Sequence, residues 1–224
     1  MSPAELGPFW LSLRVAGLAT LLIVGLGLPI AYGLARSRFP GKSLVAGVVV
    51  LPLVLPPTVL GYLLLQVFGR RTGFGMWLES TWGISIVFHW SGAVLASAIA
   101  AFPMFLIPAR GALEGVDPAL EDAARLLGRG ETSVFLAVTI PLAWRGLVAG
   151  AALAFARALG DFGASLMVAG DLPGRTTTAS MAIYDAVYSG NPARAGRMTA
   201  LVAGVSILAL MVAQKAVPVR GSGR

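Results

Sequence analysis

The chain contains no cysteine and a single histidine among its 224 residues. The absence of cysteine excludes a disulfide, a thiolate metal site and a cysteine nucleophile. The lone His89 has no carboxylate at ligand spacing, so we expect it to act as a hydrogen-bonding or interface group and expect no metal site. Charged residues make up only 12% of the chain, against roughly 25% in an average soluble domain. Such a composition excludes an ordinary soluble protein.

The chain contains long runs of residues without any charged side chain. Residues 15–35, 43–69 and 80–109 contain no Asp, Glu, Lys or Arg, and the mean hydropathy of the chain is +0.82. Each run reaches the ~20 residues that a helix needs to cross a bilayer, and residues 198–214 come near the lower limit of about 17. The first run exceeds the ~7–15 residues of a secretory signal core, so we expect it to be retained. The sequence therefore predicts an all-α polytopic membrane protein that forms one domain over residues 1–224.

Five crossings account for the chain. We expect spanning helices near residues 10–35, 44–68, 86–109, 146–170 and 198–216, with a polar loop at 110–145. The fourth helix can be placed in two ways, because a span at 132–156 is also apolar enough. That choice puts Pro141 inside a helix, where proline costs about 3 kcal/mol, whereas proline near a helix start costs little. This difference favours 146–170, and Pro56-Pro57 should break or kink the second helix.

The distribution of Lys and Arg predicts the orientation. One side receives ten of them, Arg36, Arg38, Lys42, Arg110, Arg125, Arg129, Arg145, Lys215, Arg220 and Arg224, and the other receives six, Arg14, Arg70, Arg71, Arg175, Arg194 and Arg197. Cytoplasmic loops carry the excess of positive charge. We therefore expect the loop 110–145 and the C-terminus in the cytoplasm and the N-terminus outside. This bias also accounts for the net charge of +7 without a nucleic-acid partner. Residues 171–197 should form an outer loop that carries a short helix.

A short helix is expected within the cytoplasmic loop. Asp117 is a good N-cap, Pro118 suits the first helical position, and Gly128 suits the residue after the end. Acidic residues in the first turns, here Glu121 and Asp122, are favoured by the helix dipole. A small apolar face is formed at helical spacing by Leu120, Ala123, Ala124 and Leu127. Because so short a helix is marginal alone, we expect it to pack against its own membrane domain or against a partner.

The same loop resembles the cytoplasmic EAA loop of ABC importer permeases. That pattern is E-A-A, three residues, G, nine residues and I-x-L-P, and the chain has Asp122-Ala123-Ala124, Gly128 and Val138-Thr139-Ile140-Pro141 at the same spacing. The resemblance implies the transmembrane domain of a type I ABC importer with a cytoplasmic coupling helix. The residues that it places in contact with an ATPase are Glu121, Asp122, Ala123, Ala124, Gly128 and Pro141.

A second resemblance concerns the cargo. Residues 155–170 read FARALGDFGASLMVAG, which is similar to the A-R-A-[LI]-G-[ED]-[FY]-G-[AS] region of molybdate and sulfate permeases and closer to the molybdate branch. It implies an oxyanion importer of the bacterial cell membrane for molybdate, with sulfate, tungstate or thiosulfate as alternatives. The implied partners are a second copy of the chain, two cytoplasmic ABC ATPase subunits that bind ATP and Mg, and an extracytoplasmic oxyanion-binding protein.

The pair Arg157 and Asp161 is the candidate for a translocation path or a gate. Charges within a bilayer are costly and usually face the bundle interior or water. On a continuous helix they share one stripe with small residues, namely Gly146, Gly150, Ala154 and Ala164, and such stripes mark close helix contacts. The alternative is an i,i+4 ion pair within one helix that neutralises itself.

The sequence gives less support to two other classes of function. An ion-coupled secondary transporter could use Arg157 and Asp161 as a proton relay, but it would not need an EAA-type loop. An intramembrane enzyme would need a nucleophile, metal ligands or paired acids at depth. Gly41-Lys42-Ser43 resembles the end of a phosphate-binding loop, but the position of its required first glycine is Arg36. We therefore expect a transport subunit that is no enzyme and has no ATP site of its own.

Overall fold

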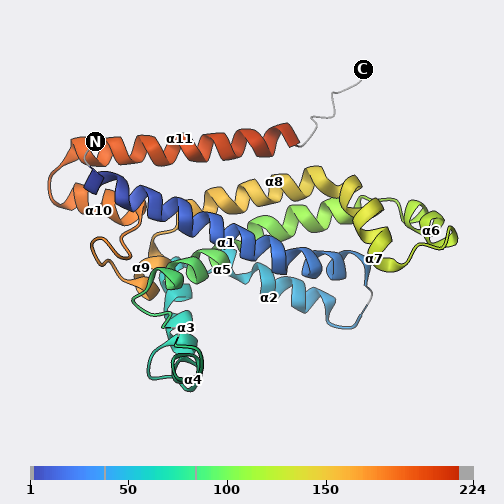
Figure 1. Cartoon of the computed structure of the whole chain (residues 1–224), viewed down its shortest axis with the longest axis horizontal. Coiled ribbons are helices and arrows are strands. Elements are labelled where there is room, and N and C mark those ends of the chain that lie inside the picture. Colours follow the sequence, from blue (N-terminus) through green and yellow to red (C-terminus); the bar gives the residue numbers. More distant parts are fainter. Residues whose placement is uncertain (1–2, 38, 84, 217–224) are drawn as a thin grey trace.

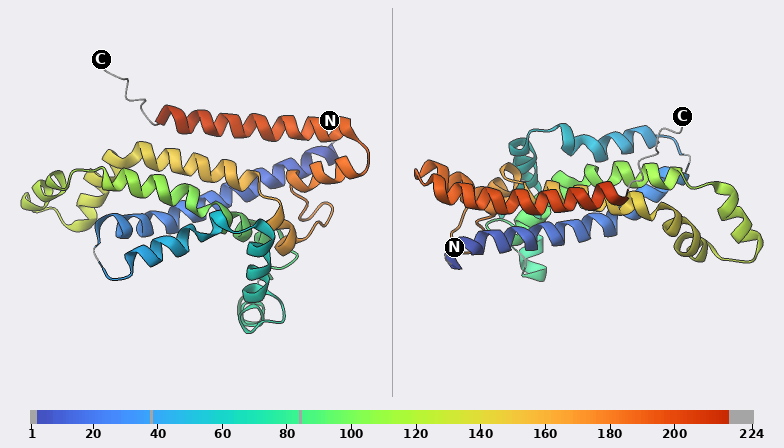
Figure 2. Two further views of the ribbon diagram at one scale, coloured as in Figure 1. Left: turned by 180° about the vertical axis from the view of Figure 1, so that it is seen from behind. Right: turned by 90° about the horizontal axis from the view of Figure 1, so that it is seen from above.

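The computed structural model describes residues 3–37, 39–83 and 85–216, and in these residues every regular element is a helix. Four long helices lie side by side along one axis: α1 (Pro3–Arg36), α5 (Trp90–Glu114), α8 (Ile140–Leu159) and α11 (Pro192–Ala216) (Figure 1). The helices expected near residues 10–35, 86–109 and 198–216 are thus present. The short helix α6 (Pro118–Leu126) lies at one end of the molecule, and the start of α1 and α10 (Ala179–Tyr188) lie at the other (Figures 1 and 2).

Helix α5 forms the centre of the bundle and packs against both α1 and α8. Its buried face is rich in alanine, with Phe105 and Leu113 as the large buried side chains. Against it, α8 presents glycine: a Cβ atom on Gly146 would lie 2.4 Å from the Cβ of Ala112, and one on Gly150 would lie 3.0 Å from the carbonyl oxygen of Phe105. The expected stripe of small residues therefore does bring two helices into close contact.

The second hydrophobic run is broken at its prolines. It forms α2 (Lys42–Val54) and α3 (Pro57–Phe68), which meet at an angle of 116°. Leu55 adopts an extended conformation, which a following proline favours, and Pro57 occupies the first helical position of α3. The predicted proline break is confirmed, and the two halves together make either a broken span or a re-entrant loop, so the crossing predicted near 44–68 stays a prediction. Beyond the break, α3 leads to α4 (Gly73–Trp82), which projects from the bundle (Figure 1).

The fourth helix corrects the sequence prediction. A continuous helical segment runs over Glu131–Leu159, so the helix predicted at 146–170 is wrong and the placement at 132–156 is close. The segment consists of α7 (Glu131–Val134), a π-helical turn (Phe135–Thr139) and α8. In an α-helix the ring of a proline clashes with the carbonyl of residue i−4. Pro141 is tolerated here because the wider π turn directly before it gives that carbonyl room.

The chain leaves the axis of α8 at Gly160 and turns into α9 (Gly163–Ala169). Phe162, with φ −127° and ψ −64°, lies outside helical geometry, so Arg157 lies in the last turn of a helix and not near the middle of one. The predicted short helix within residues 171–197 is confirmed as α10. Arg38, Arg220, Arg224 and the two terminal segments, 1–2 and 217–224, lie outside the described residues, so the predicted orientation of the termini stays a prediction.

Candidate functional site

Helix α6 has the local structure that its sequence predicts. The Asp117 carboxylate accepts a hydrogen bond from the backbone N–H of Ala119 at 2.9 Å, and Pro118 is the first helical residue. At the other end, Gly128 has φ +81°, the left-handed conformation that glycine adopts at low cost. These caps define a helix of nine residues at the far end of the molecule from α10 (Figure 1).

One side of α6 is apolar and faces outward. The side chains of Leu126 and Leu127 are 88% and 84% exposed, and Leu120 and Ala123 are exposed too. The expected apolar face differs in one member, because Ala124 is buried and turns toward the bundle. Large apolar side chains gathered on a helix beyond the bundle mark a surface for a partner.

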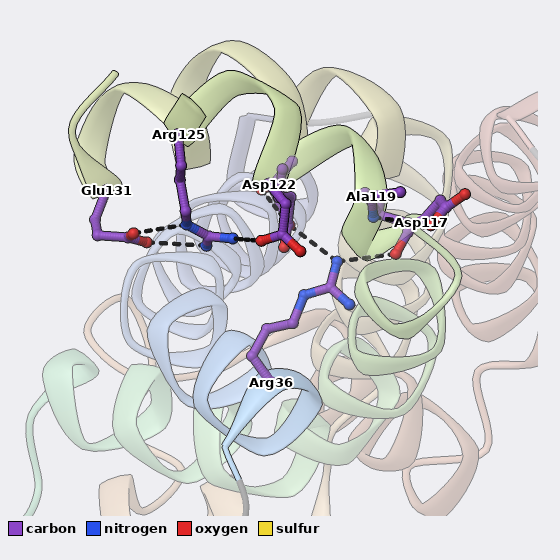
Figure 3. Close-up of polar contacts among 9 residues, drawn as sticks. Arg36, Asp117, Ala119, Asp122, Arg125 and Glu131 are labelled. Atoms are coloured by element: carbon purple, nitrogen blue, oxygen red, sulfur yellow. Dashed lines mark hydrogen bonds and ion pairs between the residues drawn. The ribbon is translucent and has the colours of Figure 1, made fainter. Parts of the chain in front are cut away.

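The charged residues of α6 tie it to the start of α7. Arg125 donates to Asp122 at 2.7 Å and to the two carboxylate oxygens of Glu131 at 2.7 and 3.0 Å (Figure 3). The hydrogen bonds that Arg125 donates to Glu131, and then the one to Asp122, raise the pKa of its guanidinium above the usual value. The charge is therefore fixed. The remaining predicted contact residues, Gly128 and Pro141, are exposed.

Glu121 does not lie on the outward surface where the resemblance placed it. Its side chain is 3% exposed, and its Oε1 atom accepts hydrogen bonds from Arg36 Nη2 at 2.9 Å and from Thr139 Oγ1 at 2.7 Å. The same Arg36 nitrogen also donates to the carbonyl oxygen of Val116 at 3.0 Å. In Figure 3 the Arg36 side chain reaches from the end of α1 toward α6. Sequence reasoning missed this arrangement because the partners of Glu121 are 85 and 18 residues away.

The Arg157 and Asp161 side chains do form an ion pair, but their interaction is weak because the atoms are far apart. Arg157 Nη1 lies 3.4 Å from Asp161 Oδ1. The buried Asp161 carboxylate instead accepts stronger hydrogen bonds from the backbone N–H and the hydroxyl of Ser165, at 3.0 and 2.6 Å. Ser165 is the third residue of α9, whose N–H has no partner within the helix. Asp161 therefore caps the next helix and is no simple i,i+4 partner.

Arg157 opens onto a groove of about 530 Å³ between the end of α8 and the starts of α3 and α9, where Pro57, Thr58 and Gly163 are among the lining residues. Its side chain is 30% exposed. A guanidinium carries five N–H donors, and the 3.4 Å hydrogen bond to Asp161 uses one of them. Chemically, the groove offers a guanidinium with N–H donors beside the Asp161 carboxylate, which lines the same groove.

A larger cavity, of about 770 Å³, lies at the opposite end from α6 and was not predicted from the sequence. Its walls include four basic side chains from separate segments and one acid: Arg14, His89, Arg175, Arg194 and Asp185. Burial, and then a hydrogen bond with Asp171, raise the pKa of the Asp185 carboxyl. The guanidinium of Arg14 stacks on the ring of Trp90 at 4.1 Å. No spacing along the chain groups these residues, since α1, α5, α10 and α11 each contribute.

Comparison with known proteins shows which proteins this chain is similar to. The family model described as "Binding-protein-dependent transport system inner membrane component" matches residues 23–217. The chain is 43% identical over 205 residues to the molybdenum transport system permease protein ModB of Escherichia coli strain K12, covering 91% of this chain and 90% of that protein. It is 38% identical over 208 residues to the putative molybdenum transport system permease protein YvgM of Bacillus subtilis strain 168, covering 93% and 92%.

A solved structure shows the same fold. The inward-facing MetNI methionine ABC transporter matches with a TM-score of 0.72 at 19% identity, covering 97% of this chain and 100% of the matched chain. The arrangement of helices is therefore that of a type I ABC importer transmembrane domain, as the EAA-type spacing indicates.

Proposed function

Because this chain belongs to the family of binding-protein-dependent transport system inner membrane components, we propose that it forms the membrane pathway of an ATP-driven importer for molybdate. The observation that carries this proposal is the 43% identity to a molybdenum permease, which extends over 91% of the chain. Sulfate, tungstate and thiosulfate are the competing cargoes, because they share the charge and tetrahedral shape of molybdate.

The groove at Arg157 supports an anionic cargo. A dianion that enters a membrane-embedded path is stabilised by a positive potential, and Arg157 supplies a guanidinium at a groove between helices. The Asp161 carboxylate lines the same groove and offsets part of this potential, while its hydrogen bonds from Ser165 hold it at the start of α9. In this proposal a second copy of the chain faces the groove across a shared path, and Arg157 lines that path.

The energy comes from a separate ATPase that binds α6. The exposed Leu126 and Leu127 supply an apolar contact surface, and the ATPase holds ATP and Mg. The end of the bundle with α6 lies in the cytoplasm, and the end with α10 lies outside, where an oxyanion-binding protein delivers cargo. Closure of two ATPase subunits on ATP moves both coupling helices, and the path switches from inward-facing to outward-facing.

Reconstitution tests the proposal. The permease, its ATPase and its binding protein are placed in liposomes, and uptake of molybdate, tungstate, sulfate and thiosulfate is measured with and without ATP. We expect ATP-dependent uptake with molybdate preferred. Uptake driven by an ion gradient without ATPase would refute the proposal, and a preference for sulfate would correct the cargo.

A further inference from the structure

Three residues from three separate elements meet at the bundle end of α6. Arg36 is the last residue of α1, Glu121 lies in α6, and Thr139 is the last residue of the π-helical turn. We propose that this set, the Glu121 clasp, is the positioning device that converts movement of α6 into movement of α1 and α8. The proposal rests on the proposed function, because it assigns the residues through which the ATPase would act.

The clasp is strong because its acid is buried. A single Glu121 oxygen accepts hydrogen bonds from Arg36 at 2.9 Å and from Thr139 at 2.7 Å, and the side chain is 3% exposed. A buried carboxylate that loses its partner is strongly disfavoured. Displacement of α6 away from α1 or the π turn would create that state. The three elements are therefore expected to move together and not to slide apart.

The Glu121 clasp also contacts the helix Glu131–Leu159 at Thr139, where the regular α-helical hydrogen bonding is interrupted. Thr139 ends a turn with π-type hydrogen bonds, and Pro141, two residues later, has no N–H to donate. Kinks in helices concentrate at such sites. A pull on Thr139 would thus change the angle of α8, whose other end carries Arg157 and the groove. This gives a continuous route from the ATPase surface to the anion path.

The exposed pair Arg125–Glu131 also joins α6 to α7, but the ion pair between Arg110 and Glu114 joins no two elements. Arg110 and Glu114 are four residues apart on α5 and are both partly exposed. Such a pair adds little to stability and links no two elements. It therefore provides a matched control, in which an acid loses its charge near the same end of the bundle without release of α6.

A labelling experiment tests whether the clasp holds α6. Because the chain contains no cysteine, Ala124→Cys on the buried face of α6 and Ala123→Cys on its exposed face report on single sites. We measure the rate of maleimide labelling of each in the purified permease. Adding Thr139→Val, which removes a hydrogen bond to a charged group, or Glu121→Gln, which removes the charge that strengthens both hydrogen bonds, should accelerate labelling at position 124 about tenfold. Labelling at position 123 should not change, and Glu114→Gln should have no effect.

A coupling experiment tests whether the clasp transmits movement. The ratio of oxyanion taken up to ATP hydrolysed is measured for the reconstituted complex with each variant. We expect Glu121→Gln and Thr139→Val to lower this ratio several-fold while ATP hydrolysis and copurification of the ATPase persist. A purely structural role would lower uptake and hydrolysis together, and would overturn the proposal, as would unchanged labelling at position 124. A wild-type complex without uptake would instead refute the proposed function, and the labelling result would still decide whether the clasp holds α6.

Discussion

The close contact between α5 and α8 gives a quantitative prediction for Gly146→Ala. The new Cβ atom would lie 2.4 Å from the Cβ of Ala112 and 3.4 Å from the carbonyl oxygen of Pro108. Two carbon atoms at optimal separation are about 3.5–4.0 Å apart, so the two helices would have to separate. Gly111 provides the control, because it lies on α5 beside Ala112 and a Cβ there meets no atom within 4 Å.

Two opposing effects determine how much Gly146→Ala changes the free energy of unfolding. Replacing glycine by alanine within a helix contributes up to about 1 kcal/mol of stability, and inserting a methyl group into a packed contact costs about 1–3 kcal/mol. The first term is common to both variants. Gly146→Ala should therefore be about 1–3 kcal/mol less stable than Gly111→Ala. Ala112→Gly removes the atom that is struck, so the double variant Gly146→Ala/Ala112→Gly should recover most of the packing cost.

Unfolding of the purified permease in mixed detergent micelles measures these differences. In the double-mutant cycle, the double variant should lose less stability than the sum of the two single variants, which reveals an interaction between positions 112 and 146. Equal stability of Gly146→Ala and Gly111→Ala would contradict this prediction, because α5 and α8 would then not be in contact at Gly146.

Three further predictions concern charged and polar groups. If the positive charge of Arg157 attracts the anion, as proposed, Arg157→Gln should lower oxyanion uptake about tenfold or more and Arg157→Lys far less; equal uptake by all three proteins would contradict this. Ser165→Ala should destabilise the fold by about 1.5–3 kcal/mol, since it removes a hydrogen bond to the buried Asp161 carboxylate, and an unchanged unfolding curve would contradict it. Asp185 has a raised pKa in the folded state, so its contribution to stability is present below its unfolded pKa of about 3.9 and is lost as the pH rises through the folded pKa. The melting temperature of Asp185→Asn should accordingly match that of the wild type near pH 3.5 and exceed it at pH 7, and a constant difference at both pH values would contradict the assignment.

Features that depend on neighbouring residues could be predicted from the sequence. Long uncharged runs predict α1, α5 and α11 because a helix satisfies its own backbone hydrogen bonds within the membrane. Asp117, Pro118 and Gly128 predict the ends of α6 because capping acts within a turn of the helix. Asp122 and Ala123 are exposed, and their contact with an ATPase stays a prediction.

Features that depend on contacts between residues far apart in the chain could not be predicted from the sequence. The placement of the fourth helix turned on the cost of Pro141, and sequence reasoning assigned that cost to an ideal α-helix, whereas the chain forms a π turn before it. The burial of Glu121 depends on Arg36, which the fold brings across from the end of α1. Nothing in the spacing around Glu121 distinguishes a residue that contacts a partner from one that faces its own bundle.

The central claim is that another protein grips the outward face of α6 to drive uptake. The most direct test is Leu126→Glu, which places a charge on the apolar surface without touching the bundle, with Thr132→Glu, at an exposed position in the first turn of α7, as the control. We predict that Leu126→Glu abolishes both copurification of the ATPase and ATP-driven molybdate uptake, while Thr132→Glu retains both. Wild-type uptake by Leu126→Glu would contradict the account.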